Sequence, residues 1–161
     1  MRSLILAVVT VSLLMSCRSE KAPEGFESPS SAIDSLFRAY GVQDMSQNEA
    51  RRRLQARERF ELLDPALFRS CFSDWQGEHD QALGGFVFGQ LVAAKEDMKI
   101  EVEEDTARVQ VAPASSEIQP IVLVKQQLAW KIDLRQSVPP RIRQDLYEVY
   151  RRARRAERGA R

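Results

Sequence analysis

MKIEVEEDTARVQV, residues 98–111, alternates apolar and polar side chains on both sides of Glu104-Asp105. Alternation with a period of two is typical of a β-strand that buries one face and leaves the other in water. The stretch therefore predicts an antiparallel hairpin with one wet face. A second antiparallel pair is predicted in IVLVKQQLAWKIDL, residues 121–134, with its turn near Gln126-Gln127, and Pro139-Pro140 ends the sheet.

Before this hairpin, apolar residues recur at the three- and four-residue spacing of α-helices. Residues 31–34 (SAID), just after Pro29, form a capping box that predicts the start of a first helix, and Gly41 predicts its end. Residues 46–49 (SQNE) predict the start of a second, highly charged helix that is exposed over most of its surface. Asp64-Pro65 predicts a third helix, with Asp as the cap and Pro as the first helical residue. The apolar positions of the three helices are Ile33, Leu36, Phe37, Tyr40, Ala50, Leu54, Leu67, Phe68, Cys71, Phe72 and Trp75.

Two further segments flank the hairpins. Residues 86–88 (FVF) follow Gly84-Gly85 and predict a strand, in which Gly89 introduces a bulge or a sharp bend. A last helix is predicted after the prolines, with apolar positions at Ile142, Leu146, Val149 and Tyr150. Helices followed by an antiparallel meander define an α+β fold. We expect N-terminal helices packed on one face of a curved sheet, plus a C-terminal helix.

The N-terminus has the layout of an export signal. A short positive start, residues 1–3, precedes an apolar run, residues 4–14, of about eleven residues, whereas a membrane-spanning helix needs roughly 20. Residues 14–17 (LMSC) resemble the lipobox of bacterial lipoproteins. In that family cleavage falls before the cysteine, here between Ser16 and Cys17. The resemblance implies that Cys17 carries a diacylglyceryl thioether and usually an amide-linked third acyl chain.

The lipoprotein resemblance implies a location in the bacterial cell envelope, with the acyl chains on Cys17 in a membrane. Arg18, and not Asp, follows the cysteine, which implies the outer membrane, facing the periplasm, if the cell has two membranes. The alternatives are an ordinary cleaved signal with an accidental cysteine, or an anchor that is never cleaved. The predicted organisation is a signal peptide (1–16), a lipidated cysteine and tether (17–29), a folded domain (30–138) and a basic C-terminal helix (139–161).

The order of elements also carries a resemblance. A capped helix, a charged helix, the Leu63-Asp64-Pro65 opening of a third helix and the closing strand 128–133 (LAWKID) are similar to the nuclear transport factor 2-like (cystatin-like, cone-shaped) superfamily. The resemblance covers about Ser30 to Pro139. It implies a sheet that curls around a cavity closed by helices. The alternative is another α+β sandwich with the same core residues.

Some members of that superfamily are enzymes, such as ketosteroid isomerases and dehydratases, and many others only bind ligands or partners. A cavity lined by Tyr40, Trp75 and Trp130 with a buried carboxylate favours proton-transfer chemistry on a small apolar substrate. The candidate carboxylates are Asp34, Asp74 and Asp133, although Asp34 also fits a helix cap and Asp133 an outward strand position. A cavity filled by phenylalanines favours an interaction module, and the residues concerned are Phe37, Phe68, Phe72 and Phe86.

The remaining chemistry of the chain is sparse. Glu78-His79-Asp80 invites a metal site, but the chain has one histidine and adjacent residues seldom converge on one ion, so we interpret the segment as a solvated loop. Cys71 fits a buried small hydrophobe better than a nucleophile, and an acylated Cys17 leaves it no disulfide partner. The net charge of +1 argues against a nucleic-acid coat. We expect no metal and no cofactor.

The C-terminal segment is strongly basic. Arg151, Arg152, Arg154 and Arg155 lie at the end of the predicted last helix, where they favour contact with an anionic lipid surface or an acidic partner. The alternative is a solvated helix end. Together these patterns predict a membrane-anchored envelope lipoprotein that serves as a ligand- or protein-binding module. The second hypothesis is a small pocket enzyme anchored in the envelope, and the third is a purely structural envelope protein with no ligand.

Overall fold

The computed structural model describes residues 26–56, 65–112 and 118–159. The predicted signal peptide, with Ser16, the predicted lipidation site Cys17 and the predicted cap Asp64 lie outside the described residues. No helix within these ranges is long and apolar enough to cross a membrane. The elements are α1 (Pro29–Ala39), α2 (Gln47–Gln55), α3 (Pro65–Cys71), η1 (Glu78–Asp80), α4 (Gln81–Ala93), β1 (Lys99–Glu103), β2 (Thr106–Gln110), β3 (Ile121–Gln126), β4 (Ala129–Ile132), α5 (Leu134–Ser137) and α6 (Pro140–Gly159).

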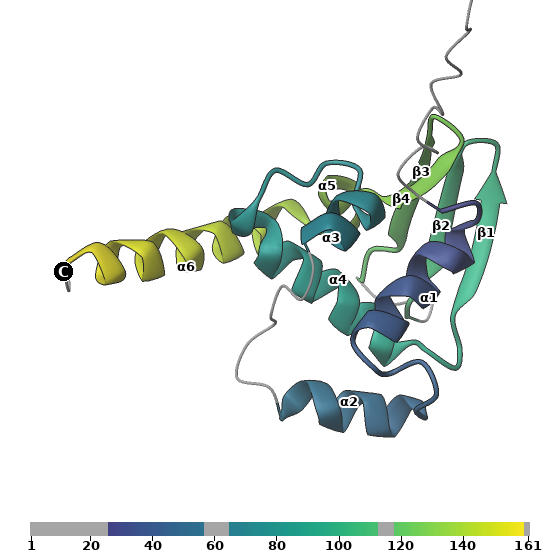
Figure 1. Ribbon diagram of the computed structural model, residues 1–161, viewed down its shortest axis with the longest axis horizontal. Coiled ribbons are helices and arrows are strands. Elements are labelled where there is room, and N and C mark those ends of the chain that lie inside the picture. Colours follow the sequence, from purple (N-terminus) through teal and green to yellow (C-terminus); the bar gives the residue numbers. More distant parts are fainter. Residues whose placement is uncertain (1–25, 57–64, 113–117, 160–161) are drawn as a thin grey trace, which may run out of the picture.

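The four strands form one antiparallel sheet in the order β1-β2-β3-β4. α1, α3 and α5 contact this sheet, whereas α2 and α6 lie against α4 (Figure 1). Val109 lies opposite Ile100 and Ile121, and Leu123 lies opposite Ile132, so the buried side chains share one face. This confirms the α+β fold and both predicted hairpins. The second turn differs from the prediction, because Leu128 has a φ of 71° and leaves the strand for an exposed turn.

The first helix begins three residues earlier than its predicted capping box. Ser28 is the N-cap, and its hydroxyl accepts the backbone N–H of Ser31 at 3.1 Å while the Ser31 hydroxyl accepts the N–H of Ser28 at 3.1 Å. Pro29 then occupies the first helical position, where its missing N–H costs nothing. Asp34 is therefore an exposed residue inside α1, and its predicted cap role is wrong. The predicted end at Gly41 is confirmed by its φ of 63°.

The predicted N-terminal tether extends to residue 29, but Phe26, Ser28 and Pro29 belong to the folded body. The backbone N–H of Trp130 donates to the carbonyl of Phe26 at 2.7 Å, which adds a bridge beside β4. Ser28 and Pro29 belong to the start of α1. The body therefore includes residues from Phe26 onward.

Residues 86–88 lie in α4, so the predicted strand and its bulge at Gly89 are wrong. The helix runs through the middle of the molecule and contacts α2, α5, α6 and η1 (Figure 1). A helix with neighbours on several sides is apolar around most of its circumference and shows no helical periodicity. Short apolar runs of this kind do not distinguish a buried helix from a strand.

Replacement of Gly89 by alanine is expected to stabilise the protein. A Cβ built at Gly89 meets no heavy atom within 4 Å, and glycine inside a helix costs about 0.5–1 kcal/mol relative to alanine. We expect the free energy of unfolding to rise by about this amount in urea denaturation. Gly84→Ala is the matched control in the same helix, because its Cβ lies 3.2 Å from the Phe68 ring. A loss of stability in Gly89→Ala would contradict the helical assignment.

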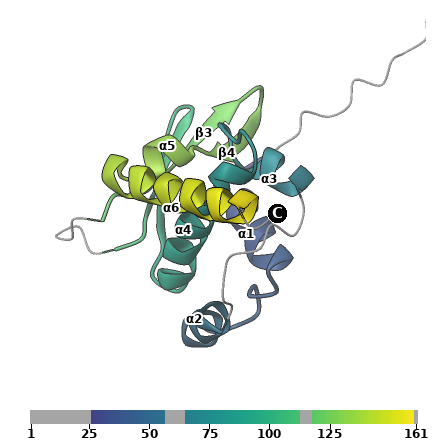
Figure 2. The same ribbon diagram turned by 90° about the vertical axis from the view of Figure 1, so that its left-hand side faces the viewer.

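The interior between helices and sheet is filled by aromatic side chains. Phe68 is fully buried, with ring centroids 5.3 Å from Phe72, 4.9 Å from Trp75 and 6.4 Å from Tyr40. Phe37 is also buried, while Phe86 is partly buried. α6 contacts α4 and η1, crosses in front of α4 in Figure 2 and extends away from the body in Figure 1.

Candidate functional site

The three aromatic residues predicted to line a pocket lie in or beside the core. Tyr40 and Trp130 are buried, and Trp75 is partly buried. Tyr40 and Trp75 both pack against Phe68, so phenylalanine occupies the space between them. None of the three lines either of the two open cavities described below. This packing matches the filled interior that we associated with an interaction module.

The carboxylates proposed for proton transfer have structural roles at helix starts or face solvent. The Asp74 side chain accepts the backbone N–H groups of Leu134 and Arg135 at 3.0 and 3.1 Å. Burial raises the pKa of Asp74, and the Leu134 N–H opposes this shift. Asp133 caps α5 by accepting the N–H of Gln136 at 2.9 Å, which corrects its predicted outward strand position.

Glu78-His79-Asp80 is not a solvated loop. It forms the single turn η1, in which Asp80 is only 3% exposed. The Asp80 carboxylate accepts the Tyr147 hydroxyl of α6 and the Gln76 backbone N–H, each at 2.7 Å. Burial, followed by the hydrogen bond to Asp80, raises the pKa of Tyr147 to about 12. Asp80 thus attaches α6 to the body, and Tyr147 remains a neutral donor.

Three aromatic rings gather around this hydrogen bond. The His79 ring lies 5.9 Å from the Tyr147 ring and 6.5 Å from the Tyr150 ring, measured between centroids. The Nε2 atom of His79 is 3.7 Å from Asp80 Oδ1. Within the described ranges, no group of His, Cys, Asp and Glu side chains is arranged to hold a metal ion.

An open cavity of about 880 Å³ lies beside these rings, between η1, α5 and residues 140–151 of α6. Its lining includes three arginines. Among the described residues, no aspartate or glutamate lines it. Arg135 Nε lies 3.6 Å from Asp74 Oδ2, and Arg143 donates to the backbone carbonyl of Arg135 at 3.0 Å. We call this cavity the arginine pocket; its lining is Gln76, His79, Arg135, Pro140, Arg143, Gln144, Tyr147, Tyr150 and Arg151.

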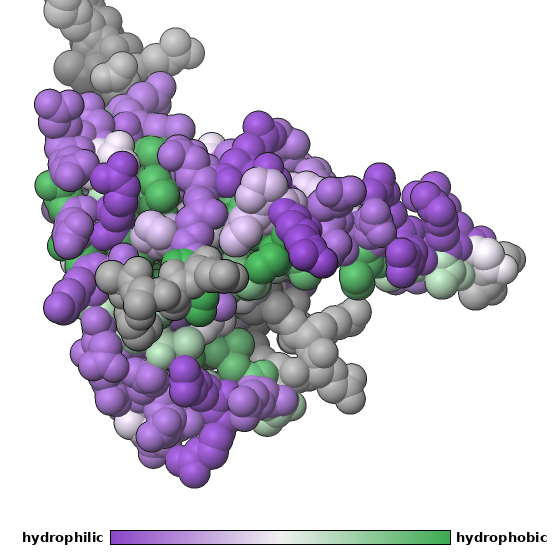
Figure 3. Space-filling view, turned by 180° about the vertical axis from the view of Figure 1, so that it is seen from behind, coloured by the Kyte–Doolittle hydropathy of each residue, from purple (hydrophilic) through white to green (hydrophobic). Residues whose placement is uncertain are grey.

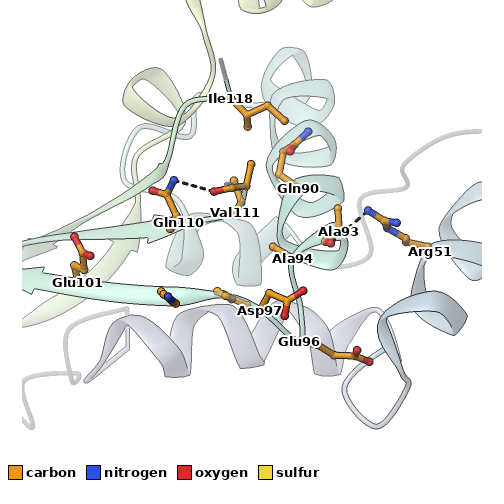
Figure 4. A pocket seen from close by; sticks show the side chains of 13 residues that line it. Arg51, Gln90, Ala93, Ala94, Glu96, Asp97, Glu101, Gln110, Val111 and Ile118 are labelled. Atoms are coloured by element: carbon orange, nitrogen blue, oxygen red, sulfur yellow. Dashed lines mark hydrogen bonds between the residues drawn. The ribbon is translucent and has the colours of Figure 1, made fainter. Parts of the chain in front are cut away.

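A second cavity, of about 1050 Å³, lies between the end of α4, α2 and the β1-β2 hairpin (Figure 4). Arg51 donates to the carbonyl of Ala93 across one side of it at 3.4 Å. Its charged lining mixes both signs, with Arg51 and Lys99 opposed by Glu96, Asp97 and Glu101. The mixture selects no particular ligand charge, so this cavity is the weaker candidate.

The last nine residues of α6, 151–159, are all exposed, and we call them the arm. The arm carries five arginines and one glutamate, a net charge of +4. Hydrophilic side chains cover most of its surface where it extends away from the body (Figure 3). Two ion pairs lie along it, Arg152 with Glu148 at 3.1 Å and Arg154 with Glu157 at 3.3 Å. The predicted contact residues Arg151, Arg152, Arg154 and Arg155 all belong to the arm.

Cys71 is fully buried in α3, in agreement with its predicted role as a small hydrophobe. Burial raises the pKa of the Cys71 thiol to about 12. Because the thiolate is the reactive form, this side chain is chemically inert at neutral pH.

Comparison with models of protein families, with curated proteins and with solved structures found no match for this chain. The functional argument therefore depends on geometry and residue chemistry. The arginine pocket was missed from the sequence because its walls come from three separate elements. A signal was nevertheless present: Arg143, Tyr147 and Arg151 follow one another at four-residue spacing, which places them on one helix face.

Proposed function

We propose that the protein is a lipid-anchored envelope lipoprotein with an NTF2-like domain that acts as a binding module, and that its arm binds the anionic headgroups of the bilayer. In a cell with two membranes the proposed site is the periplasmic face of the outer membrane. The single observation that carries the proposal is the arm itself. It extends the chain beyond the folded body with every residue exposed and a net charge of +4.

The arm has the chemistry that an anionic surface requires. Basic residues near such a surface contribute about 1 kcal/mol each, and the guanidinium fork matches phosphate oxygens. Nine helical residues at roughly 1.5 Å each give a contact about 13 Å long. Arginine and alanine are strong helix formers, so the arm keeps its shape without packing against the body.

The lipid anchor and the arm support one another in this proposal. One acyl chain binds a membrane only marginally, whereas two or three bind it firmly. An anchored chain is held close to the headgroups, so even weak attraction by the arm orients the domain on the surface. The carboxylates of Asp74 and Asp133 accept backbone N–H groups at the start of α5. This structural role favours a binding function over the proton-transfer alternative, which needs a carboxylate that faces a substrate.

The proposal is tested by sedimentation with lipid vesicles. The protein from Arg18 onward contains every described residue and lacks the acylated cysteine. We expect it to bind vesicles rich in phosphatidylglycerol at low salt, and to bind phosphatidylcholine vesicles weakly. Replacement of Arg154, Arg155 and Arg158 by glutamine removes about 3 kcal/mol, which weakens binding by about 100-fold.

The matched control removes the same charge from another exposed helix. Arg51, Arg52 and Arg53 of α2 are exposed, and their replacement by glutamine is expected to leave vesicle binding nearly unchanged. Binding that is insensitive to salt, or an equal loss in the arm and α2 variants, would contradict a role for the arm.

A further inference from the structure

We infer that the arginine pocket is a binding site for a phosphate ester whose phosphate is attached to a ring. The observation behind this inference is the convergence of three guanidinium groups and three aromatic rings on one cavity with no lining carboxylate among the described residues. The inference does not depend on the lipid anchor. Of the arginines in the arm it uses only Arg151, which lines the pocket, and not Arg152, Arg154, Arg155 or Arg158. It adds a small-molecule site to the proposed surface contact.

The charge of the pocket comes from two helices. Arg135 lies in α5, while Arg143 and Arg151 lie two turns apart along α6. Each guanidinium has five N–H donors. Arg135 Nε lies 3.6 Å from Asp74 Oδ2, and one terminal nitrogen of Arg143 donates to the backbone carbonyl of Arg135. The remaining N–H groups of the guanidinium groups can therefore donate to a ligand. Phosphate accepts such donors in pairs, which makes arginine its preferred partner in proteins.

A buried carboxylate, Asp80, contacts the pocket residue Tyr147 and does not line the pocket itself. Both oxygens of Asp80 are engaged, one by the Tyr147 hydroxyl and the other by the Gln76 backbone N–H. Asp80 is only 3% exposed, so its oxygens are not accessible to a ligand. Its effect on the pocket is to fix the position of the Tyr147 ring, which reduces the ordering that ligand binding must impose.

The rings of His79, Tyr147 and Tyr150 form the second half of the site. The His79 centroid lies 5.9 Å from the Tyr147 centroid and 6.5 Å from the Tyr150 centroid, and the rings are tilted by 48° and 56°. All three rings line the cavity, where an aromatic ring of a ligand can pack against them edge to face or offset. The cavity volume of about 880 Å³ lies within the range of small-molecule sites, roughly 300–1,000 Å³. A ring that carries phosphate therefore uses both halves, whereas inorganic phosphate uses only the arginines.

The test is calorimetric titration of the protein from Arg18 onward with phenyl phosphate, inorganic phosphate and phenol. We expect phenyl phosphate to bind more tightly than inorganic phosphate, and phenol to bind very weakly. Arg143→Gln is expected to weaken phenyl phosphate binding by about 10- to 100-fold, because a charged hydrogen-bond donor is lost. Tyr150→Leu is expected to weaken phenyl phosphate and to leave inorganic phosphate nearly unchanged.

Arg141→Gln is the matched control, since Arg141 is an exposed residue of α6 outside the pocket lining. Circular dichroism and thermal unfolding establish that each variant is folded. Absence of phenyl phosphate binding at millimolar concentration would overturn the inference. Equal effects of Arg141→Gln and Arg143→Gln in folded proteins would overturn it as well.

The same phosphate chemistry occurs in free metabolites and in lipid headgroups, and vesicles distinguish the two sources. If Arg143→Gln weakens binding to phosphatidylinositol vesicles and phenyl phosphate competes with them, the ligand is a headgroup. If vesicle binding is unchanged while phenyl phosphate binding falls, the ligand is a free phosphate ester. Either result supports the pocket. The Arg154, Arg155 and Arg158 variant tests the arm separately, because none of these residues lines the pocket.

Discussion

Cys17→Ala is expected to abolish acylation and to move the protein out of the membrane fraction after a high-salt wash. Each buried methylene of an acyl chain contributes about 0.8 kcal/mol, so two long chains hold a protein far more firmly than a charged helix does. The arm alone contributes a few kcal/mol that salt screens. The measurement is fractionation of cells that produce the full chain, combined with mass spectrometry of the N-terminal peptide.

Cys71→Ala provides the control for this experiment. The chain has two cysteines, and Cys71 is fully buried in α3, so its replacement cannot change lipidation. We expect Cys71→Ala to remain in the membrane fraction with its acyl chains intact. A wild-type protein with an unmodified Cys17, or a Cys17→Ala variant that stays bound after the salt wash, would contradict the lipoprotein hypothesis. An intact N-terminal Met1 would identify the uncleaved anchor instead.

The sheet was predictable because alternation along 98–111 and 121–134 is a local property. β2 alternates between buried and more exposed side chains, so its sequence records its environment directly. The second helix was predictable for a similar reason: Ser46 and Glu49 form a capping box within four residues. Local hydrogen bonds and local periodicity need no knowledge of distant parts of the chain.

The strand predicted at residues 86–88 shows where local patterns fail. α4 contacts α2, α5, α6 and η1, and none of its residues is fully exposed, so its sequence has no polar face to establish a helical period. The predicted cap at Ser31 failed differently. Ser28 and Ser31 form a capping box in which serine, and not the usual glutamate or glutamine, is the third helical residue. The pattern of Ser31 followed by the acidic Asp34 resembles a typical capping box more closely, so the sequence predicted the wrong start.

The candidate site depends mainly on contacts between distant residues. Asp80 is buried because it accepts the hydroxyl of Tyr147, which lies 67 positions further along the chain. No local pattern distinguishes this aspartate from an exposed one. The arm was predicted correctly as a basic helix end, because a run of arginines with few apolar residues cannot be buried. Whether large aromatic residues line or fill a cavity depends on packing, which composition does not reveal.

Phe68→Ala is expected to lower the free energy of unfolding by about 3–5 kcal/mol. Phe68 is fully buried and contacts Tyr40, Phe72 and Trp75, so its loss removes the ring that joins α3 to α1. Domains of this size are stable by only about 5–15 kcal/mol, so the change represents a large share of the total. The measurement is urea denaturation of the protein from Arg18 onward. Val102→Ala, at a side chain 55% exposed, is the control and is expected to change stability little.

Phe68→Ala also tests whether the interior of the wild-type protein is filled by side chains or contains a cavity. Removal of the Phe68 ring leaves an apolar space bordered by Tyr40 and Trp75, two of the residues that the sequence placed in a pocket. Apolar cavities of this kind stay dry and bind benzene. We therefore expect benzene to raise the melting temperature of Phe68→Ala and to leave that of the wild-type protein unchanged. Stabilisation of the wild-type protein by benzene, with a small loss in Phe68→Ala, would mean that a cavity already exists and would favour the pocket enzyme over the binding module.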